Sequence, residues 1–102
     1  MLSETGHPKE DRPLWINMIS QECAKFLERN LPLLGVCMYP VIDRPDWDHT
    51  EIWHHSGIWD HDFASKYSRV LHLESAVAIV NGQQLISKSQ KNKFARLLMR
   101  YF

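Results

Sequence analysis

The chain has 102 residues, of which 44% are hydrophobic and 11% aromatic, and this suits one small globular domain. Its 12 basic and 12 acidic side chains cancel, which removes the long-range attraction that nucleic acid or an anionic membrane needs. No apolar run reaches the roughly 20 residues that span a bilayer, and the first residues do not resemble a signal peptide. We therefore predict a cytoplasmic protein without nucleic-acid or membrane partners.

The first part of the chain has the pattern of a strand, a helix and a second strand. Residues 1–6 leave room only for the end of a strand and the loop after it. Asp11 and Pro13 are typical of a helix start, where Asp accepts free backbone N–H groups, and apolar side chains at three- and four-residue spacing predict a helix over residues 11–30. Residues 33–42 are a nearly continuous apolar run, typical of a strand buried on both faces of a parallel sheet. Cys23 and Cys37 lie in this helix and this strand, which favours reduced, buried thiols.

The second part is predicted to be a long loop followed by helical segments. Residues 43–62 are rich in tryptophan, histidine and acidic side chains, a composition typical of functional loops. Residues 69–72 fit a short extended segment. Residues 74–102 are predicted to be helical, as a helix up to Ile86 in which Gly82 is unfavourable and a last amphipathic segment after it. The predicted fold class is therefore α/β.

Carboxylates follow both predicted strands. Glu4 stands at the end of the first and Asp43 at the end of the second. In α/β barrels the active site lies at the C-terminal ends of the strands. Retaining glycosidases need a carboxylate nucleophile about 5 Å from a carboxylic acid, and aromatic rings bind the apolar faces of sugars. The chain offers carboxylates and indoles at this end of the predicted sheet.

Two stretches of the sequence resemble the family 1 and related clan A β-glycosidases. Ser3-Glu4-Thr5-Gly6 is similar to the Glu-Thr-Gly signature at the end of the seventh barrel strand. Residues 35–47, Gly-Val-Cys-Met-Tyr-Pro-Val-Ile-Asp-Arg-Pro-Asp-Trp, together with Trp53-His54-His55-Ser56-Gly57-Ile58-Trp59-Asp60, resemble the eighth strand and the loop after it. The resemblance spans about residues 1–60. It implies a partial (β/α)8 barrel made of about the last two βα units: a strand end, a helix, a buried parallel strand, a long loop and C-terminal helices.

The resemblance also implies roles for individual residues. Glu4 corresponds to the nucleophile that forms the glycosyl–enzyme. The implied substrate-binding residues are Tyr39, Asp43, Trp47, His54, His55 and Trp59. The Asn-Glu-Pro motif that carries the acid/base residue on the fourth strand of such barrels does not occur in the sequence. We therefore expect a truncated or split C-terminal part of a glycoside hydrolase that is inactive as an isolated monomer. The expected partners are a carbohydrate and a complementing barrel segment or second copy at the exposed strand edges, with no cofactor.

Two other functions fit the same residues. The first is a non-catalytic protein that binds carbohydrate or a partner chain through the strand edges and the loop. The second is a divalent metal site in the loop, for which the candidate ligands are His49, His54, His55 and His61 with Asp46, Asp48 or Glu51. The spacing matches no zinc signature, and the adjacent His54 and His55 would diverge in an extended segment, so we predict no metal.

Overall fold

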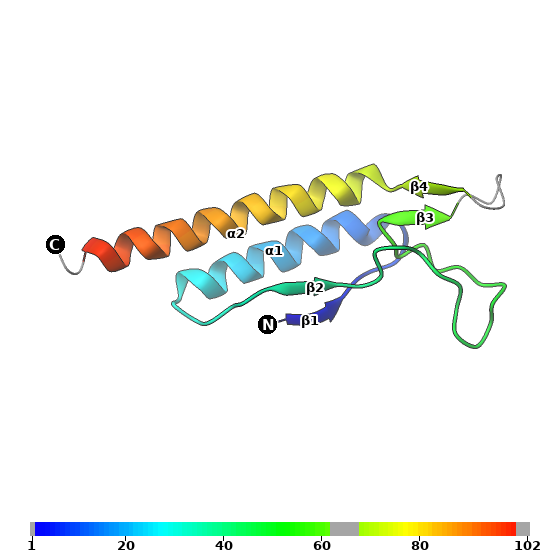
Figure 1. The fold of residues 1–102 in the computed structure, drawn as a ribbon, viewed down its shortest axis with the longest axis horizontal. Coiled ribbons are helices and arrows are strands. Elements are labelled where there is room, and N and C mark those ends of the chain that lie inside the picture. The colour runs from blue at the N-terminus through cyan, green and yellow to red at the C-terminus, as the bar shows by residue number, and fades with distance from the viewer. Residues whose placement is uncertain (1, 62–67, 100–102) are drawn as a thin grey trace.

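The computed structural model describes residues 2–61 and 68–99 of the chain (Figure 1). The elements in chain order are β1 (Leu2–Thr5), the 3-10 turn η1 (Lys9–Asp11), α1 (Arg12–Glu28), β2 (Val36–Met38), β3 (Trp59–His61), β4 (Arg69–Leu71) and α2 (Leu73–Met99). β1 pairs in parallel with β2, and β3 pairs antiparallel with β4. The chain is therefore a mixed helix and strand protein. Within the described ranges, neither helix combines the length and the apolar character that crossing a bilayer demands.

β1, α1 and β2 form a parallel strand–helix–strand unit. Leu2 lies opposite Val36 and Thr5 lies opposite Met38, with an irregularity in the ladder between them. The indole Nε1 of Trp15 donates a hydrogen bond to Thr5 Oγ1 at 2.7 Å, which fastens α1 to the end of β1. α1 and α2 lie side by side and run in the same direction, opposite to that of the two strands (Figure 1). This is the arrangement that two successive βα units adopt.

The strand predicted over residues 33–42 is much shorter in the structure. β2 spans only Val36–Met38, and Ile42 pairs beyond it through an isolated parallel bridge to Trp59. Cys37 is exposed, so the prediction of a strand buried on both faces was wrong. The reason is that α1 packs on one face of the β1–β2 sheet, while no described element covers the other face. Cys23 is buried as predicted, and burial, assisted by the charge of Glu22, raises the pKa of its thiol.

The later elements agree only in part with the sequence-based prediction. The predicted loop over residues 43–62 contains β3, while the extended segment expected at residues 69–72 is present as β4. The two helical segments predicted after residue 74 are one continuous helix, α2. Asp11 makes no side-chain capping bond to α1, because η1 leads directly into the helix and holds Asp11 in a helical conformation. Residues 62 and 100–102 of the predicted loop and helix lie outside the described residues.

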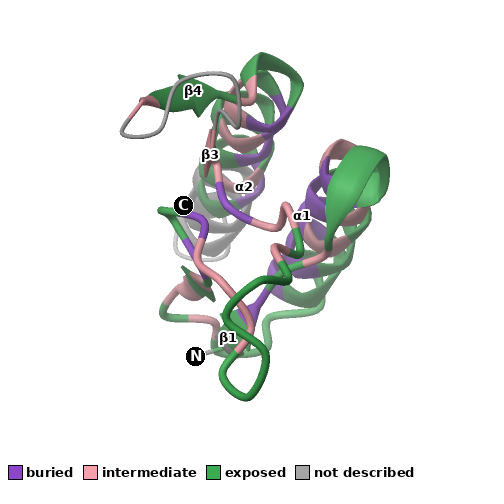
Figure 2. Cartoon of the chain, turned by 90° about the vertical axis from the view of Figure 1, so that its right-hand side faces the viewer, coloured by how far each residue is buried: buried purple, intermediate pink, exposed green. Residues whose placement is uncertain are grey.

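The core is a seam of mostly small side chains between the two helices. Figure 2 shows buried stripes on both α1 and α2. The buried residues of the seam are Ile16, Ser20, Cys23, Ala24, Leu27, Ser75, Ala78, Gly82 and Ser89. A Cβ atom at Gly82 would collide with the side chain of Ser20, whose Oγ donates to the Ile16 carbonyl at 2.7 Å. Gly82, which lowers helix propensity, is therefore the residue that lets the helices approach closely.

We expect Gly82→Leu to destabilise the protein by about 1–3 kcal/mol, because the added side chain must push α2 away from Ser20. Thermal and urea unfolding followed by circular dichroism measures the change. Gly35→Ala is the matched control, since nothing lies within 4 Å of a Cβ at that position. Equal stability of the Gly82→Leu protein and the control would contradict the close contact between the helices.

Candidate functional site

Glu4 lies at the C-terminal end of β1, beside a cavity. Its side chain is exposed, and its backbone has a φ of 53°, which residues other than glycine rarely adopt. It falls in the irregular part of the β1–β2 ladder, and such bulges redirect side chains next to binding sites. The cavity has a volume of about 340 Å³. Its lining residues are Glu4, Thr5, Gly6, His7, Pro8, Tyr39, Pro40, His54 and Ser56.

An aromatic and cationic group borders this cavity. The guanidinium carbon of Arg44 lies 5.5 Å from the centroid of the Tyr39 ring and 5.0 Å from that of Trp47. Arg44 Nε also donates to the Tyr39 hydroxyl at 2.5 Å. Trp47 is 79% exposed, so its indole is available to a ligand. Arg44 therefore links the exposed Trp47 ring to Tyr39, which lines the cavity.

Asp46 anchors the loop that brings His54 to the cavity. His54 Nε2 lies 2.7 Å from Asp46 Oδ1, and the backbone N–H groups of Asp48 and His49 donate to Asp46 Oδ2 at 3.0 and 3.1 Å. The hydrogen bond with His54, followed by that from the Asp48 N–H, lowers the pKa of Asp46 to about 2. The carboxylate therefore stays ionised and keeps its hydrogen bonds at neutral pH.

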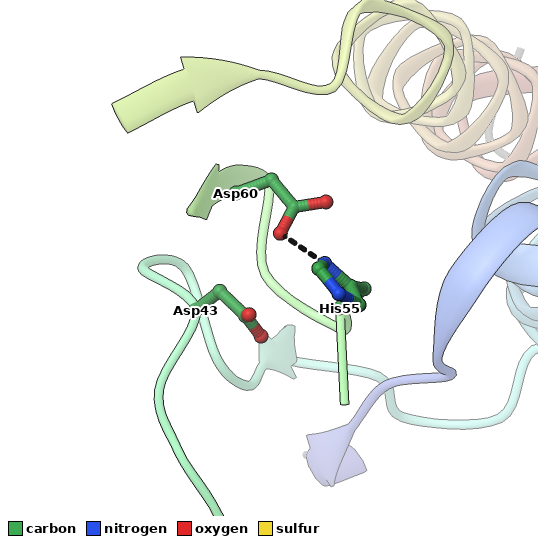
Figure 3. Close-up of side chains that lie close together, drawn as sticks. All are labelled: Asp43, His55 and Asp60. Atoms are coloured by element: carbon green, nitrogen blue, oxygen red, sulfur yellow. Dashed lines mark hydrogen bonds and ion pairs between the residues drawn. The ribbon is translucent and has the colours of Figure 1, made fainter. Parts of the chain in front are cut away.

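A second cluster consists of Asp43, His55 and Asp60 (Figure 3). Asp43 is only 1% exposed, and its Oδ1 accepts hydrogen bonds from the N–H groups of Ser56 at 3.0 Å and Gly57 at 3.3 Å. His55 Nδ1 lies 2.7 Å from Asp60 Oδ1. A Cβ at Gly57 would collide with the backbone of Asp43, so glycine is required for this close approach. The loop after β2 and the start of β3 thus bring two carboxylates and an imidazole together.

Asp60 is also paired with the buried side chain of Arg12. Arg12 Nη1 lies 3.3 Å from Asp60 Oδ2 and donates to the Gly57 carbonyl at 2.7 Å, while Nε donates to the Lys9 carbonyl at 2.6 Å. Burial acts to raise the pKa of Asp60. Hydrogen bonds from His55 and the His61 N–H, and the charge of Arg12, outweigh it and hold that pKa below its ordinary value. Asp60 is therefore an ionised carboxylate in a largely enclosed position.

The residues predicted from the sequence fall into separate places. Glu4, Tyr39 and His54 line the cavity, and Trp47 stacks on Arg44, which also contacts Tyr39, whereas Asp43 and His55 belong to the second cluster. Trp59 lies in β3, pairs with Leu71 and is not among the residues that line the cavity. The histidines of the proposed loop metal site do not gather. His49 and His54 contact Asp46, and His61 stacks on Trp53 with ring centroids 4.3 Å apart.

Arg12 and Asp60 were missed as site residues. Arg12 stands next to Asp11 and Pro13, so the sequence indicates only a helix start. Asp60 appears only as the last residue of the Gly-Ile-Trp-Asp stretch. No local pattern joins two residues 48 positions apart, and only the folded chain shows the pair.

Comparison with protein-family models, curated protein sequences and solved structures finds no match for the chain. The cavity beside Glu4, the cluster of Asp43, His55 and Asp60, and the two stretches that resemble β-glycosidases are the features from which function can be inferred.

We expect Arg12→Met to lower the free energy of unfolding by about 3–5 kcal/mol, because it removes the ion pair of the partly buried Asp60 and the side-chain donor to the Lys9 and Gly57 carbonyl groups. Lys25→Met is the control, since the Lys25–Glu22 pair is exposed and such pairs contribute about 0–1 kcal/mol. Urea unfolding of the two variants measures the difference. Similar losses in both would show that the Arg12 pair is not a structural link.

We also expect acid to remove the stabilising effect of Asp46. Its pKa of about 2 lies below the ordinary value of 3.8, so the ionised side chain stabilises the folded state above about pH 4. The contribution is lost as the pH falls from there toward 2. Asp46→Asn should therefore be less stable than the unaltered protein at pH 5, and the difference should narrow as the pH falls and be nearly gone at about pH 1, below the folded-state pKa. A difference that stays constant across this range would contradict the assignment.

Proposed function

We propose that residues 1–102 are the C-terminal part of a retaining β-glycoside hydrolase, with Glu4 as its nucleophile. The observation that supports this best is that Glu4, Tyr39 and His54 line one cavity at the C-terminal ends of two parallel strands joined by a helix. Active sites of α/β barrels lie at this end of the sheet. The cavity of about 340 Å³ is within the range of small-molecule sites, which hold roughly 300–1,000 Å³.

The proposed barrel places β1 and β2 as the seventh and eighth strands. α1 would then be the helix between them, and α2 the helix after the eighth strand. The parallel pairing of the strands and the common direction of the helices are consistent with two consecutive βα units. The left-handed backbone of Glu4 supports a functional role, because strained residues concentrate at catalytic sites.

The chemistry needs a group that the described cavity does not contain. In a retaining reaction Glu4 would attack the anomeric carbon as the bond to the leaving oxygen breaks, and a carboxylic acid about 5 Å away would give that oxygen a proton. Water would then hydrolyse the glycosyl ester. Glu4 is the single carboxylate among the described residues that line the cavity. The proton donor would come from another segment, as the lack of an Asn-Glu-Pro motif also implies.

Exposed apolar side chains support such a complementing segment. Leu34 is 90% exposed, and Val41 and Ile42, which follow β2, are also exposed. A second cavity of about 310 Å³ lies between β1 and α1, with Leu2 and Phe26 in its walls. Neighbouring strands and their helices would cover this surface in a barrel. The partner is therefore proposed to be a barrel segment, or a second copy of this chain.

A carbohydrate-binding protein without catalysis is the second candidate. The exposed indole of Trp47, held by Arg44 beside Tyr39, favours it, because aromatic surfaces bind sugar rings without a nucleophile. In that case Trp47→Ala would weaken sugar binding and Glu4→Gln would not.

We expect the isolated chain to leave an aryl β-glucoside intact. Addition of a polypeptide that carries the six preceding βα units of a family 1-like β-glycosidase, including its Asn-Glu-Pro strand, should restore hydrolysis. Glu4→Gln should reduce the restored rate by about 10³-fold or more, because the glycosyl ester can no longer form. The release of the aryl group measures the rate.

Glu10→Gln is the matched control, since Glu10 is an exposed carboxylate on η1, and it should leave the rate unchanged. Hydrolysis by the monomer alone would overturn the need for a second segment. A stable complex without activity, or with activity that survives Glu4→Gln, would overturn the role of Glu4.

A further inference from the structure

One oxygen of Asp43 is buried without a hydrogen-bond partner. Asp43 is 1% exposed, and its Oδ2 is the buried side-chain atom that lacks a partner among the described residues. Its Oδ1, in contrast, accepts from both Ser56 and Gly57. An unpaired carboxylate oxygen in a buried position is costly, and a bound ion is one partner that satisfies it.

The unpaired carboxylate belongs to a group of ligand types that suit a cation. Asp43, His55 and Asp60 each offer one ligand atom, and these atoms lie within 4.8 Å of one another. Two ligands of a tetrahedral Zn²⁺ at about 2.1 Å stand about 3.4 Å apart. The group therefore needs to contract by about 1 Å or a little more. The 2.7 Å hydrogen bond between His55 and Asp60 would be exchanged for bonds to the cation. In Figure 3 the Asp43 carboxylate and the His55 ring lie on the same side of β3.

The charge of Asp43 is not compensated by the cationic side chains near this group. Arg12 neutralises Asp60 through a 3.3 Å ion pair, and this pair accounts for one of the two negative charges. The other nearby cation, Arg69, donates to the backbone oxygen of Asp43 at 2.7 Å. The negative charge of Asp43 is therefore the one that the described contacts leave without an ionic partner.

We propose that Asp43, His55 and Asp60 bind one divalent cation, with Zn²⁺ favoured over Mg²⁺. Mixed imidazole and carboxylate ligands suit Zn²⁺, whereas Mg²⁺ prefers oxygen ligands alone. The cation ties the chain after β2 to the loop and to β3, so its role is structural. This inference is independent of the proposed glycosidase chemistry, since none of the three ligands lines the cavity beside Glu4, and it replaces the sequence-based prediction of no metal.

Calorimetric titration of the 102-residue chain with Zn²⁺ tests the site. One equivalent should bind, and Zn²⁺ should raise the melting temperature, while Mg²⁺ at the same concentration should not. Asp43→Asn should weaken Zn²⁺ binding at least tenfold and remove the rise in melting temperature. The asparagine oxygen can still accept from Ser56 and Gly57, so the loop keeps its hydrogen bonds.

Two control variants separate this site from surface binding. Asp46→Asn alters an aspartate of the same loop that contacts His49 and His54, and Cys37→Ser removes an exposed thiol. Both should retain tight binding. Absence of stoichiometric Zn²⁺ binding, or binding that depends on Asp46 or Cys37 and survives Asp43→Asn, would overturn the proposal. The melting temperature without metal shows that each variant is folded.

Discussion

The arrangement of this chain depends on the buried guanidinium of Arg12. At 4% exposure a charged group must be paired, and its partners come from η1, from the loop after β2 and from β3. The start of α1 is therefore bonded to chain that follows it by more than 40 residues. Arg12 therefore joins the strand–helix–strand unit to the loop and strand that carry the second cluster. The same link holds Ser56 in the wall of the cavity beside Glu4.

The spacing of apolar residues and the order of the predicted elements were sufficient to predict much of the fold. The apolar spacing predicted a helix over residues 11–30, and α1 spans Arg12–Glu28, because its buried side chains repeat at helical intervals. The order of elements indicated parallel pairing of the two strands. The length of the second strand was overestimated because an apolar run carries no information about which of its side chains find a covering neighbour. Leu34 and Cys37 find none among the described residues.

The candidate site was only partly accessible from the sequence. Glu4, Tyr39 and His54 were found through a resemblance between short stretches, and the fold brings them to one cavity. The link of Asp60 to Arg12 depends on a contact over 48 positions, which no periodicity encodes. The alternative of one metal site formed by the loop histidines is not matched by their contacts. His54 contacts Asp46 and His55 contacts Asp60, so the loop has two separate centres.

The two-stranded parallel sheet also limits how copies of this chain can associate. Within the described ranges β1 and β2 each have one edge without a strand partner. A twofold axis would bring like edges together and pair them antiparallel, which cannot extend a parallel sheet. Head-to-tail pairing, β1 of one copy with β2 of the next, preserves the strand direction. Four copies related by a fourfold rotation would close an eight-stranded ring, the strand number of a (β/α)8 barrel, with a glutamate from each copy around one rim.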